Sequence, residues 1–497
     1  MRISNGIAFF FFLILTLFSA YTQETSKFRI SGVQYDITGH TREFPLSQKV
    51  EIDRARVFES ETAMRAYVAD LEIKFRNLRV LESATIDVAI AASPVDGVVP
   101  VTLTVHTVDS WNIIALPRPN FDSNNGYQLK LKLKNYNFFG SMEEMNMDGF
   151  FNVDNNGDKD LGTNFDFTIP FALKGRAVEW KISSALTIPF GEVPEYEFST
   201  GFDLKQPLSF ADLHVGVKQG LSLNARDSDD ELEDDRYYLT DKAYVNLPYT
   251  IHEFEYVGKL LWTPEVSINQ NWNTEGIKDP DLTGPDFTVS HALSLGRVDW
   301  IGNFRKGFST TVSNAYVYDF YKKNGWDVSV TGTVGGYTTF FDRIGVNSRV
   351  IGFTILRGDP KEKAGDVLRG ILDKRITTDT MISLNFDLPI RIMRVNFEEI
   401  TGVHWTRYIS FDMQASPFFD MALTHDEKTG RYFSLDDGWY SGGLELIVYP
   451  MKMRSIYARA SVGFDLAEVA KSGKLTGNAS RDGETVHEYL IGIGLHY

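Results

Sequence analysis

The sequence predicts a mainly β protein, an antiparallel transmembrane β-barrel of about 16 strands that follows a small α+β domain. Three observations predict this fold: an apolar segment at the N-terminus, long stretches in which apolar and polar residues alternate, and a last strand that ends on an aromatic residue. The chain of 497 residues has 13% aromatic residues, 36 of them Phe, and 40 Gly. Strands rich in aromatic residues, without long apolar helices, are typical of such barrels.

Residues 1–23 are interpreted as a signal peptide. Arg2 precedes an apolar run from Ile7 to Phe18, and Ala20 and Thr22 then follow at the spacing that a signal peptidase recognises. The run is shorter than the ~18 apolar residues of a membrane helix, although an uncleaved N-terminal anchor is an alternative. We therefore expect the mature protein to be exported.

The composition excludes several classes of function. The chain has no cysteine, which excludes a lipidated N-terminus, disulfides and thiolate metal sites. Its formal charge of −16 makes nucleic acid an improbable partner, because phosphate binding needs clustered Lys and Arg. No catalytic motif of the zinc-protease, phosphate-loop or serine-hydrolase type occurs, and the nine His are scattered. We expect neither an enzyme nor a bound cofactor or metal.

Residues 24–110 differ from the rest of the chain and predict a small β-α-β-β domain. A strand is expected at Phe28–Thr38, and Ser60 is a suitable helix N-cap. Two further strands are expected at Thr85–Ala91 and Val101–Val108. The residues that share one face of the predicted helix are Met64, Val68, Leu71 and Phe75.

From residue 111 to 497 the pattern has a period of two. In Thr380–Arg391, for example, Ile382, Leu384 and Phe386 alternate with polar residues. A soluble β-sandwich would also alternate, but the signal peptide, the length of the segments and the alternation of short turns with long loops favour a membrane barrel. About 16 to 18 such segments can be counted.

Two acidic stretches lie in predicted loops. Asp154–Asp160 spaces oxygen ligands as calcium loops do, but it lacks the Gly at the sixth position and a distal bidentate Glu, so a hairpin tip is the simpler interpretation. Asp227–Asp235 holds seven acids and is interpreted as a loop kept in solution by its own charge repulsion.

The N-terminal domain resembles a polypeptide-transport-associated (POTRA) domain. The resemblance rests on the runs Ser31–Thr41, Asn77–Leu81 and Val105–Trp111. The stretch Asn135–Gly140 resembles the turn after the second barrel strand of the BamA/TamA-like outer-membrane assembly and translocation superfamily, the bacterial surface antigen family.

Two internal motifs resemble those of the same superfamily. Arg369 and Gly370 match the Arg-Gly of a loop motif that folds into the lumen, although Ile371 stands where an aromatic residue is usual. Phe418 and Asp420 match a Phe-x-Asp-x-Gly motif, in which Ala422 replaces the Gly.

The resemblance implies that Arg369 enters the lumen and meets a carboxylate there. Asp420 is the first candidate partner. Glu445 is the second, because Leu444 and Leu446 occupy the lipid face and leave Glu445 facing the lumen. The alternative is that Arg369 is a solvated loop residue and Asp420 an ordinary lumen-facing acid.

The C-terminal residues resemble the terminal assembly signal of outer-membrane barrels. The residues that carry this signal are Gly492, Leu495 and Tyr497.

The resemblance implies a factor in the bacterial outer membrane that inserts barrel proteins or translocates polypeptides, with its N-terminal domain in the periplasm. Its barrel seam would open sideways, and the N-terminal domain would capture client strands. The implied partners are outer-membrane lipids, unfolded barrel or secreted polypeptide clients, and periplasmic chaperones or lipoproteins. Two alternatives stay open: a passive outer-membrane channel, and a surface-exposed interaction protein.

Overall fold

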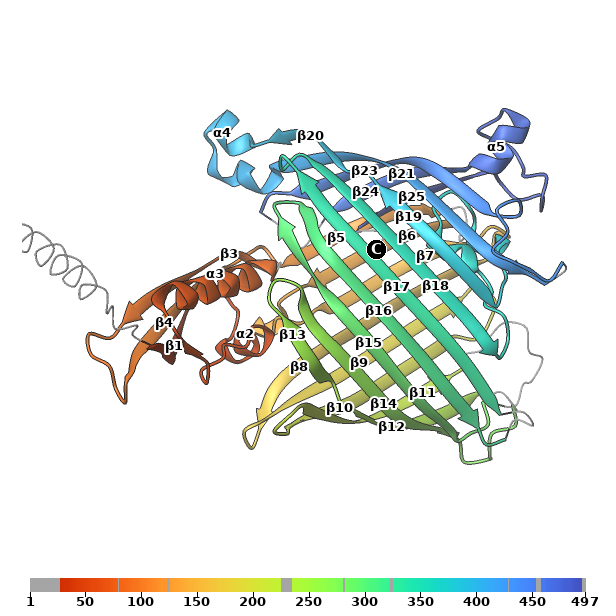
Figure 1. Ribbon diagram of the computed structural model, residues 1–497. Helices are drawn as coiled ribbons and strands as arrows, with labels where there is room; N and C mark the ends of the chain where they lie inside the picture. Colours follow the sequence, from red (N-terminus) through yellow and green to blue (C-terminus); the bar gives the residue numbers. More distant parts are fainter. Residues whose placement is uncertain are drawn as a thin grey trace, which may run out of the picture. The chain divides into compact units, whose positions relative to one another are not determined.

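The structure, a computed structural model, describes residues 27–78, 80–122, 126–224, 235–279, 282–321, 325–427, 429–452 and 457–493. The predicted signal peptide, most of the acidic run Asp227–Asp235, and Leu495 and Tyr497 lie outside these residues. The chain separates into two compact units between Asp109 and Ser110, and each unit is described by itself (Figure 1).

The first unit is an α+β domain with a mixed four-stranded sheet in the order β2-β1-β4-β3. Its strands are β1 (Lys27–Thr38), β2 (Val57–Phe58), β3 (Leu81–Ile90) and β4 (Val98–Asp109), and its helices are α2 (Glu43–Lys49) and α3 (Glu61–Asn77). Strand β1 runs parallel to β4, whereas β3 is antiparallel to β4. The sheet order leaves β3 as an edge strand with a single neighbour.

Helix α3 forms where the sequence predicts it. The Ser60 hydroxyl accepts a hydrogen bond from the Ala63 amide at 3.2 Å and so caps the first turn. The predicted apolar face is buried, and it supplies the core together with residues of β4. Helix α2 was not predicted, because an element of seven residues is too short to show a helical period.

The second unit is a closed antiparallel barrel. Its first strands are β5 (Ile113–Asp122), β6 (Gly126–Asn135), β7 (Met145–Val153), β8 (Lys159–Leu173), β9 (Arg176–Pro189), β10 (Glu195–Pro207), β11 (Asp212–Leu223), β12 (Tyr237–Asn246), β13 (Tyr249–Phe254) and β14 (Gly258–Trp272). Its later strands are β15 (Asp286–Ile301), β16 (Phe304–Asp319), β17 (Trp326–Phe340), β18 (Ile344–Arg357), β19 (Thr380–Asp387), β20 (Ile390–Val395), β21 (Phe411–Asp426), β22 (Arg431–Tyr432), β23 (Trp439–Pro450), β24 (Ala458–Asp465) and β25 (His487–Ile493).

Short helices interrupt the connections between strands. They are η1 (Phe138–Gly140), η2 (Ala364–Val367), η3 (Asp373–Arg375), α4 (Phe397–Thr401), η4 (His404–Ile409) and α5 (Leu466–Ser472). Among the residues that the structure describes, no helix is long and apolar enough to span a bilayer.

Three of the strand segments do not add a strand to the barrel wall. Strand β13 continues β12 along β14, and β20 continues β19 along β21. Strand β22 pairs with the end of β21, and β23 continues it along the same neighbour. The described residues therefore form eighteen wall strands, the upper end of the predicted range of 16 to 18 rather than about 16. Strand β25 lies beside β5 and closes the wall at a seam.

The distribution of polar and apolar residues decides between a soluble sandwich and a membrane barrel. On β19, Ile382 is 41% exposed on the outer face, while Asn385 and Asp387 on the inner face are buried. On β6, Leu129 and Leu131 are likewise exposed. A wall that exposes apolar residues and buries polar ones is inverted relative to a protein in water, and it fits a lipid surround. The fold class predicted from the sequence, a transmembrane β-barrel, is confirmed.

Strand direction defines two ends of the barrel. We call the end at which β5 begins the entry end, and the opposite end the far end. Most entry-end connections are short, such as 174–175, 302–303 and 341–343, but 396–410 is longer. The far-end loops include 358–379 and 466–486, so helices α4 and α5 lie at opposite ends (Figure 1).

Candidate functional site in the barrel lumen

The loop 358–379 between β18 and β19 folds into the lumen on apolar contacts. Ile371 is fully buried, and it belongs to a cluster that joins the loop to β19, β21 and β23. The cluster comprises Ala364, Leu368, Ile371, Ile376, Met381, Ala422 and Trp439. Burial of these side chains favours the inserted position of the loop, because each would otherwise be in contact with water.

Arg369 lies at the centre of the inserted loop and contacts three carboxylates. Its Nε and one terminal nitrogen donate to the two oxygens of Asp420 at 2.9 and 2.7 Å, in bidentate geometry. Its other terminal nitrogen donates to Asp387 at 2.6 Å and to Glu445 at 3.2 Å. The Arg369 backbone amide also donates to Asp420, at 3.0 Å.

The strand register explains why these acids converge. Asp420 of β21 lies opposite Asn385 of β19 and Ser441 of β23, so all three side chains face the lumen. Asp387 is two residues beyond Asn385 and therefore shares its face. The period of two thus places polar groups of three neighbouring strands around one point.

The site is buried, and burial strengthens the electrostatic interactions between its charged groups. Arg369 is 4% exposed and Asp420 is 0% exposed. The Arg369 guanidinium also stacks over the ring of Phe418, 3.9 Å from its centroid. Desolvating these charges is costly, and only the bidentate geometry and the full set of hydrogen bonds offset that cost. The arrangement therefore tolerates neither a missing partner nor a shifted loop.

Gly370 brings the loop against the last two strands. It has a φ of +91°, and a side chain at this position would collide with the backbone of Gly463 and Phe464 in β24. A Cβ added to Gly463 would in turn lie 2.7 Å from the Gly370 Cα. The Gly370 amide donates to Glu488 of β25 at 2.6 Å. The loop thus contacts one of the two strands that form the seam.

A second arginine fixes the loop to its neighbour at the far end. The side chain of Arg375 is fully buried and donates to Asp465 at 2.8 Å and to Asp482 at 2.7 Å. Both acids belong to the β24–β25 hairpin and its loop 466–486. The adjacent Lys374 pairs with Glu484 at 2.8 Å, but this pair is exposed.

The structure brings together most of the residues that the sequence singled out. Arg369, Gly370, Asp420 and Glu445 form one site, whereas Gly492 lies in β25 opposite Arg459 and takes no part in the Arg369 contacts. Sequence reasoning did not select Asp387, Glu488 or Arg375 for the site. The alternation along β19 places Asp387 on the inner face, so the sequence did contain a signal for this residue. Arg375 lies in a loop, where no such pattern distinguishes it.

Ile371 and Ala422, the two positions that depart from the motifs that the sequence resembles, meet in the same apolar cluster. Ile371 and Ala422 are both fully buried and both belong to the cluster around the loop. Both residues therefore contribute to the apolar packing on which the inserted loop depends.

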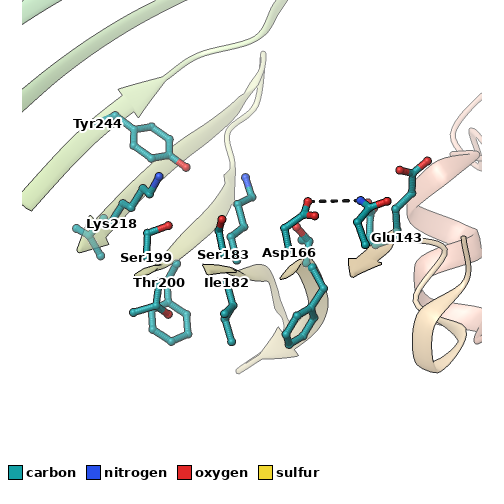
Figure 2. A pocket seen from close by; sticks show the side chains of 16 residues that line it. Glu143, Asp166, Ile182, Ser183, Ser199, Thr200, Lys218 and Tyr244 are labelled. Carbon is teal, nitrogen blue, oxygen red and sulfur yellow. Dashed lines mark hydrogen bonds between the residues drawn. The ribbon is translucent and has the colours of Figure 1, made fainter. Parts of the chain in front are cut away.

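A second feature of the lumen lies on another part of the wall. A hollow of about 490 Å³ follows the inner surface of β7 to β12 and is lined by Asp166, Ser183, Ser199, Lys218 and Tyr244 among others. Figure 2 shows Ser183, Ser199 and Lys218 pointing to one side of the wall and Ile182 and Thr200 to the other. This polar surface lies on other strands than the wall segment that binds the loop.

No protein-family model matches the sequence, and neither does any curated protein. Among solved structures, CdiB from Acinetobacter baumannii is similar, with a TM-score of 0.50 at 12% identity over 93% of this chain and 73% of that chain. CdiB from Escherichia coli matches with a TM-score of 0.38 at 10% identity, over 96% of this chain and 92% of that one. BamA from Haemophilus ducreyi lacking POTRA domains 1–3 matches with 0.36 at 12% identity, over 93% and 84%. The likeness to the Acinetobacter protein shows a shared fold, and the lower TM-scores of the other two add nothing to it.

Proposed function

We propose that this protein is a bacterial outer-membrane factor of the BamA/TamA-like superfamily that inserts barrel proteins or translocates polypeptides. One observation carries the proposal. A loop arginine, Arg369, is buried in the lumen against Asp420, and the loop tip at Gly370 also binds a strand of the seam. A passive pore needs no such coupling between a luminal loop and its seam.

The seam supplies the working surface in this proposal. When β25 and β5 separate, each exposes backbone amides and carbonyls that cannot stay unpaired in lipid. An incoming client strand satisfies these groups and adds to the wall. Pro117 in β5 and Gly492 in β25 favour separation, because Pro donates no ladder hydrogen bond and Gly weakens a strand.

The N-terminal domain holds clients in the periplasm. Its β-α-β-α-β-β order, in which β2 has only two residues and β1 runs parallel to β4, supports the POTRA-like assignment. Edge strand β3 offers a row of backbone groups on its free side, and an extended client adds there as one more strand. The entry end of the barrel faces the same compartment.

Conditional depletion with quantitative profiling of the outer-membrane fraction tests the proposal. A broad fall in other barrel proteins, with unfolded forms in the periplasm, is the expected result for an insertion factor. Loss of only one or two surface proteins identifies a dedicated translocator instead. An unchanged profile overturns both forms of the proposal.

The hollow on β7 to β12 favours one rival, a passive channel for small solutes. Its lining mixes polar residues such as Asp166 with apolar ones such as Phe202, and Lys218 lies directly opposite Lys242 in the strand register. A channel predicts a large, steady single-channel conductance that survives loss of the Arg369 contacts. An assembly factor predicts small or fluctuating currents, because the inserted loop occupies part of the lumen.

A further inference from the structure

The connection 396–410 between β20 and β21 differs from the other described turns at the entry end. It spans fifteen residues and folds into α4 and η4, whereas 136–144 holds only η1, and 174–175 and 302–303 are minimal turns. Its fold is fixed from within, because the Ser410 hydroxyl accepts from the Phe397 amide at 2.9 Å and donates to the Thr406 carbonyl at 3.1 Å. The segment is therefore a built element rather than a loose linker.

Several large apolar side chains of the segment are exposed, beside the exposed polar residues Glu399 and His404, while two of its hydroxyl groups are buried. Ile400 is 69% exposed, Trp405 62% and Ile409 51%. Thr406 and Ser410, by contrast, are buried, and their hydroxyls are hydrogen-bonded within the segment. This is the inversion seen on the lipid-facing wall, and in water it would leave a costly apolar surface.

The contacts of the segment place it on the outer side of the wall. Phe397 packs on Phe411, with ring centroids 6.3 Å apart. Phe411 faces outward, because its neighbour Asp412 points into the lumen, where it is fully buried. The apolar surface of 396–410 is thus continuous with the outward residue Met393 of β20, which is 42% exposed.

The other end of the segment reaches the first strand. Tyr408 meets Trp111 edge-on at 6.1 Å, and Trp111 stands two residues before the outward-facing Ile113 of β5. In the barrel order, β23, β24 and β25 lie between β21 and β5. The segment therefore spans the entry-end rim across the seam, and both of its contacts lie at outward positions.

We propose that residues 396–410 form an interfacial membrane anchor, which lies in the lipid head-group layer and covers the entry-end side of the seam. The residue types fit this position. Trp and Tyr concentrate where a bilayer meets water, and anionic lipids attract an arginine near the membrane surface. Arg407 donates to the Tyr408 hydroxyl at 2.9 Å, which places a cation next to the exposed aromatic rings. The anchor does not depend on the function proposed above.

Depth-dependent quenching in vesicles tests the anchor directly. Because the chain has no cysteine, Trp405→Cys and Ile400→Cys each give one label site for an environment-sensitive fluorophore. The full-length variants are placed in phosphatidylethanolamine–phosphatidylglycerol vesicles that carry nitroxide groups either on the lipid head group or deep in the acyl chain. Heat-modifiable migration on gels confirms that each variant is folded.

Two control positions calibrate the depth. Phe386→Cys labels the outer face of the wall in β19, and Glu255→Cys labels a short, exposed entry-end turn. We expect head-group nitroxides to quench labels at 405 and 400 several-fold more strongly than the label at 255. We expect deep nitroxides to quench the label at 386 most strongly.

Labels at 405 and 400 that behave like the one at 255 overturn the anchor. The surface would then face water and be open to a soluble partner. Quenching mainly by deep nitroxides also overturns it, since the segment would then lie within the hydrocarbon layer rather than at the head groups.

Discussion

At the scale of single residues, one guanidinium faces three carboxylates in a buried site. Alternation along the strands assigns each acid to the inner face, and the sequence motifs point to Arg369 and Asp420. Neither signal tells how far the loop penetrates or which of the inner-face acids it reaches. Asp387 was overlooked for that reason, although it makes the shortest of the side-chain contacts to Arg369.

Arg369→Ala should release the loop from the lumen. Removing one member of a buried ion pair typically costs about 3–5 kcal/mol, because the partners stay buried without a counter-charge. Residues 358–379 should then become cleavable by protease added at the far end. Arg369→Lys should give an intermediate result, because it keeps the charge but loses the bidentate geometry.

Arg357→Ala is the matched control for this experiment. Arg357 also precedes a glycine, but it is exposed at the end of β18. Equal cleavage in the Arg357 and Arg369 variants would contradict a specific role for Arg369.

Gly463→Ala should also displace the loop tip. The added Cβ would meet the Gly370 backbone at 2.7 Å, and backbone atoms cannot move aside as a flexible side chain can. The midpoint of thermal unfolding on gels should fall. Gly336→Ala in β17 is the control, since a Cβ there meets no atom within 4 Å and should change the midpoint little.

At the scale of elements, the loop 358–379 and the loop 466–486 form one far-end assembly. Long loops have no repeating pattern of apolar and polar residues. The sequence therefore predicted that these loops exist and at which end of the barrel they lie, but not their contacts. The buried Arg375 lies between them, whereas Lys374 makes an exposed pair with the same hairpin loop. Because Lys374 and Arg375 are adjacent cations that differ mainly in burial, variants of the two can test how much burial strengthens an ion pair.

Arg375→Gln should increase hydrogen exchange across residues 466–486 strongly, because Asp465 and Asp482 would lose a buried cation. Lys374→Gln should change it little, since exposed pairs contribute about 0–1 kcal/mol. Hydrogen–deuterium exchange read by mass spectrometry distinguishes the two. Similar exchange in both variants would mean that apolar packing alone holds the loops together.

The N-terminal domain carries a pH-dependent contact on its sheet. The ring of His106 in β4 lies between Asp36 of β1, at 2.8 Å, and Asp87 of β3, at 3.1 Å. The Asp36 hydrogen bond, together with Asp87, raises the pKa of His106 above its ordinary value of 6.5. A raised folded-state pKa stabilises the domain below the unfolded-state pKa, and this stabilisation is lost as the pH rises through the folded-state value.

The urea midpoint of this domain should therefore be higher near about pH 5.5 than near about pH 8. Proteolysis of the full-length chain at each urea concentration reads out the midpoint. His106→Gln should remove most of the difference. A difference that persists in this variant would assign it to other groups.

At the scale of the whole molecule, composition and the period of two were sufficient to predict a barrel and its division from an α+β domain. They fell short on the strand number, which is eighteen in the described residues. Where a wall strand is interrupted, as between β19 and β20, the sequence does not show whether the two segments form one wall strand or two. The pairing of β25 with β5 could not be predicted from local sequence patterns either, because these strands lie at opposite ends of the unit's sequence.

A disulfide across the seam should abolish client assembly if the seam opens. A cysteine in β5 and a facing one in β25 give this lock without competing thiols, since the chain has none. Activity should return on reduction. A cysteine pair at Ser313 and Thr331, opposite each other in β16 and β17, is the control and should be harmless. Full activity with the seam locked would exclude lateral opening.

The chain order of the lumen site bears on how the barrel itself forms. Arg369 precedes Asp387, Asp420 and Glu445, so the cation comes before every acid that it contacts in the lumen. Without it, the β19 to β23 wall would have to close around three carboxylates that repel one another. We expect the loop to act as a template on which the last strands are laid down, each one bringing a carboxylate to a guanidinium already in place. Arg369→Ala should then slow the appearance of the heat-resistant folded form, as well as loosen the finished loop.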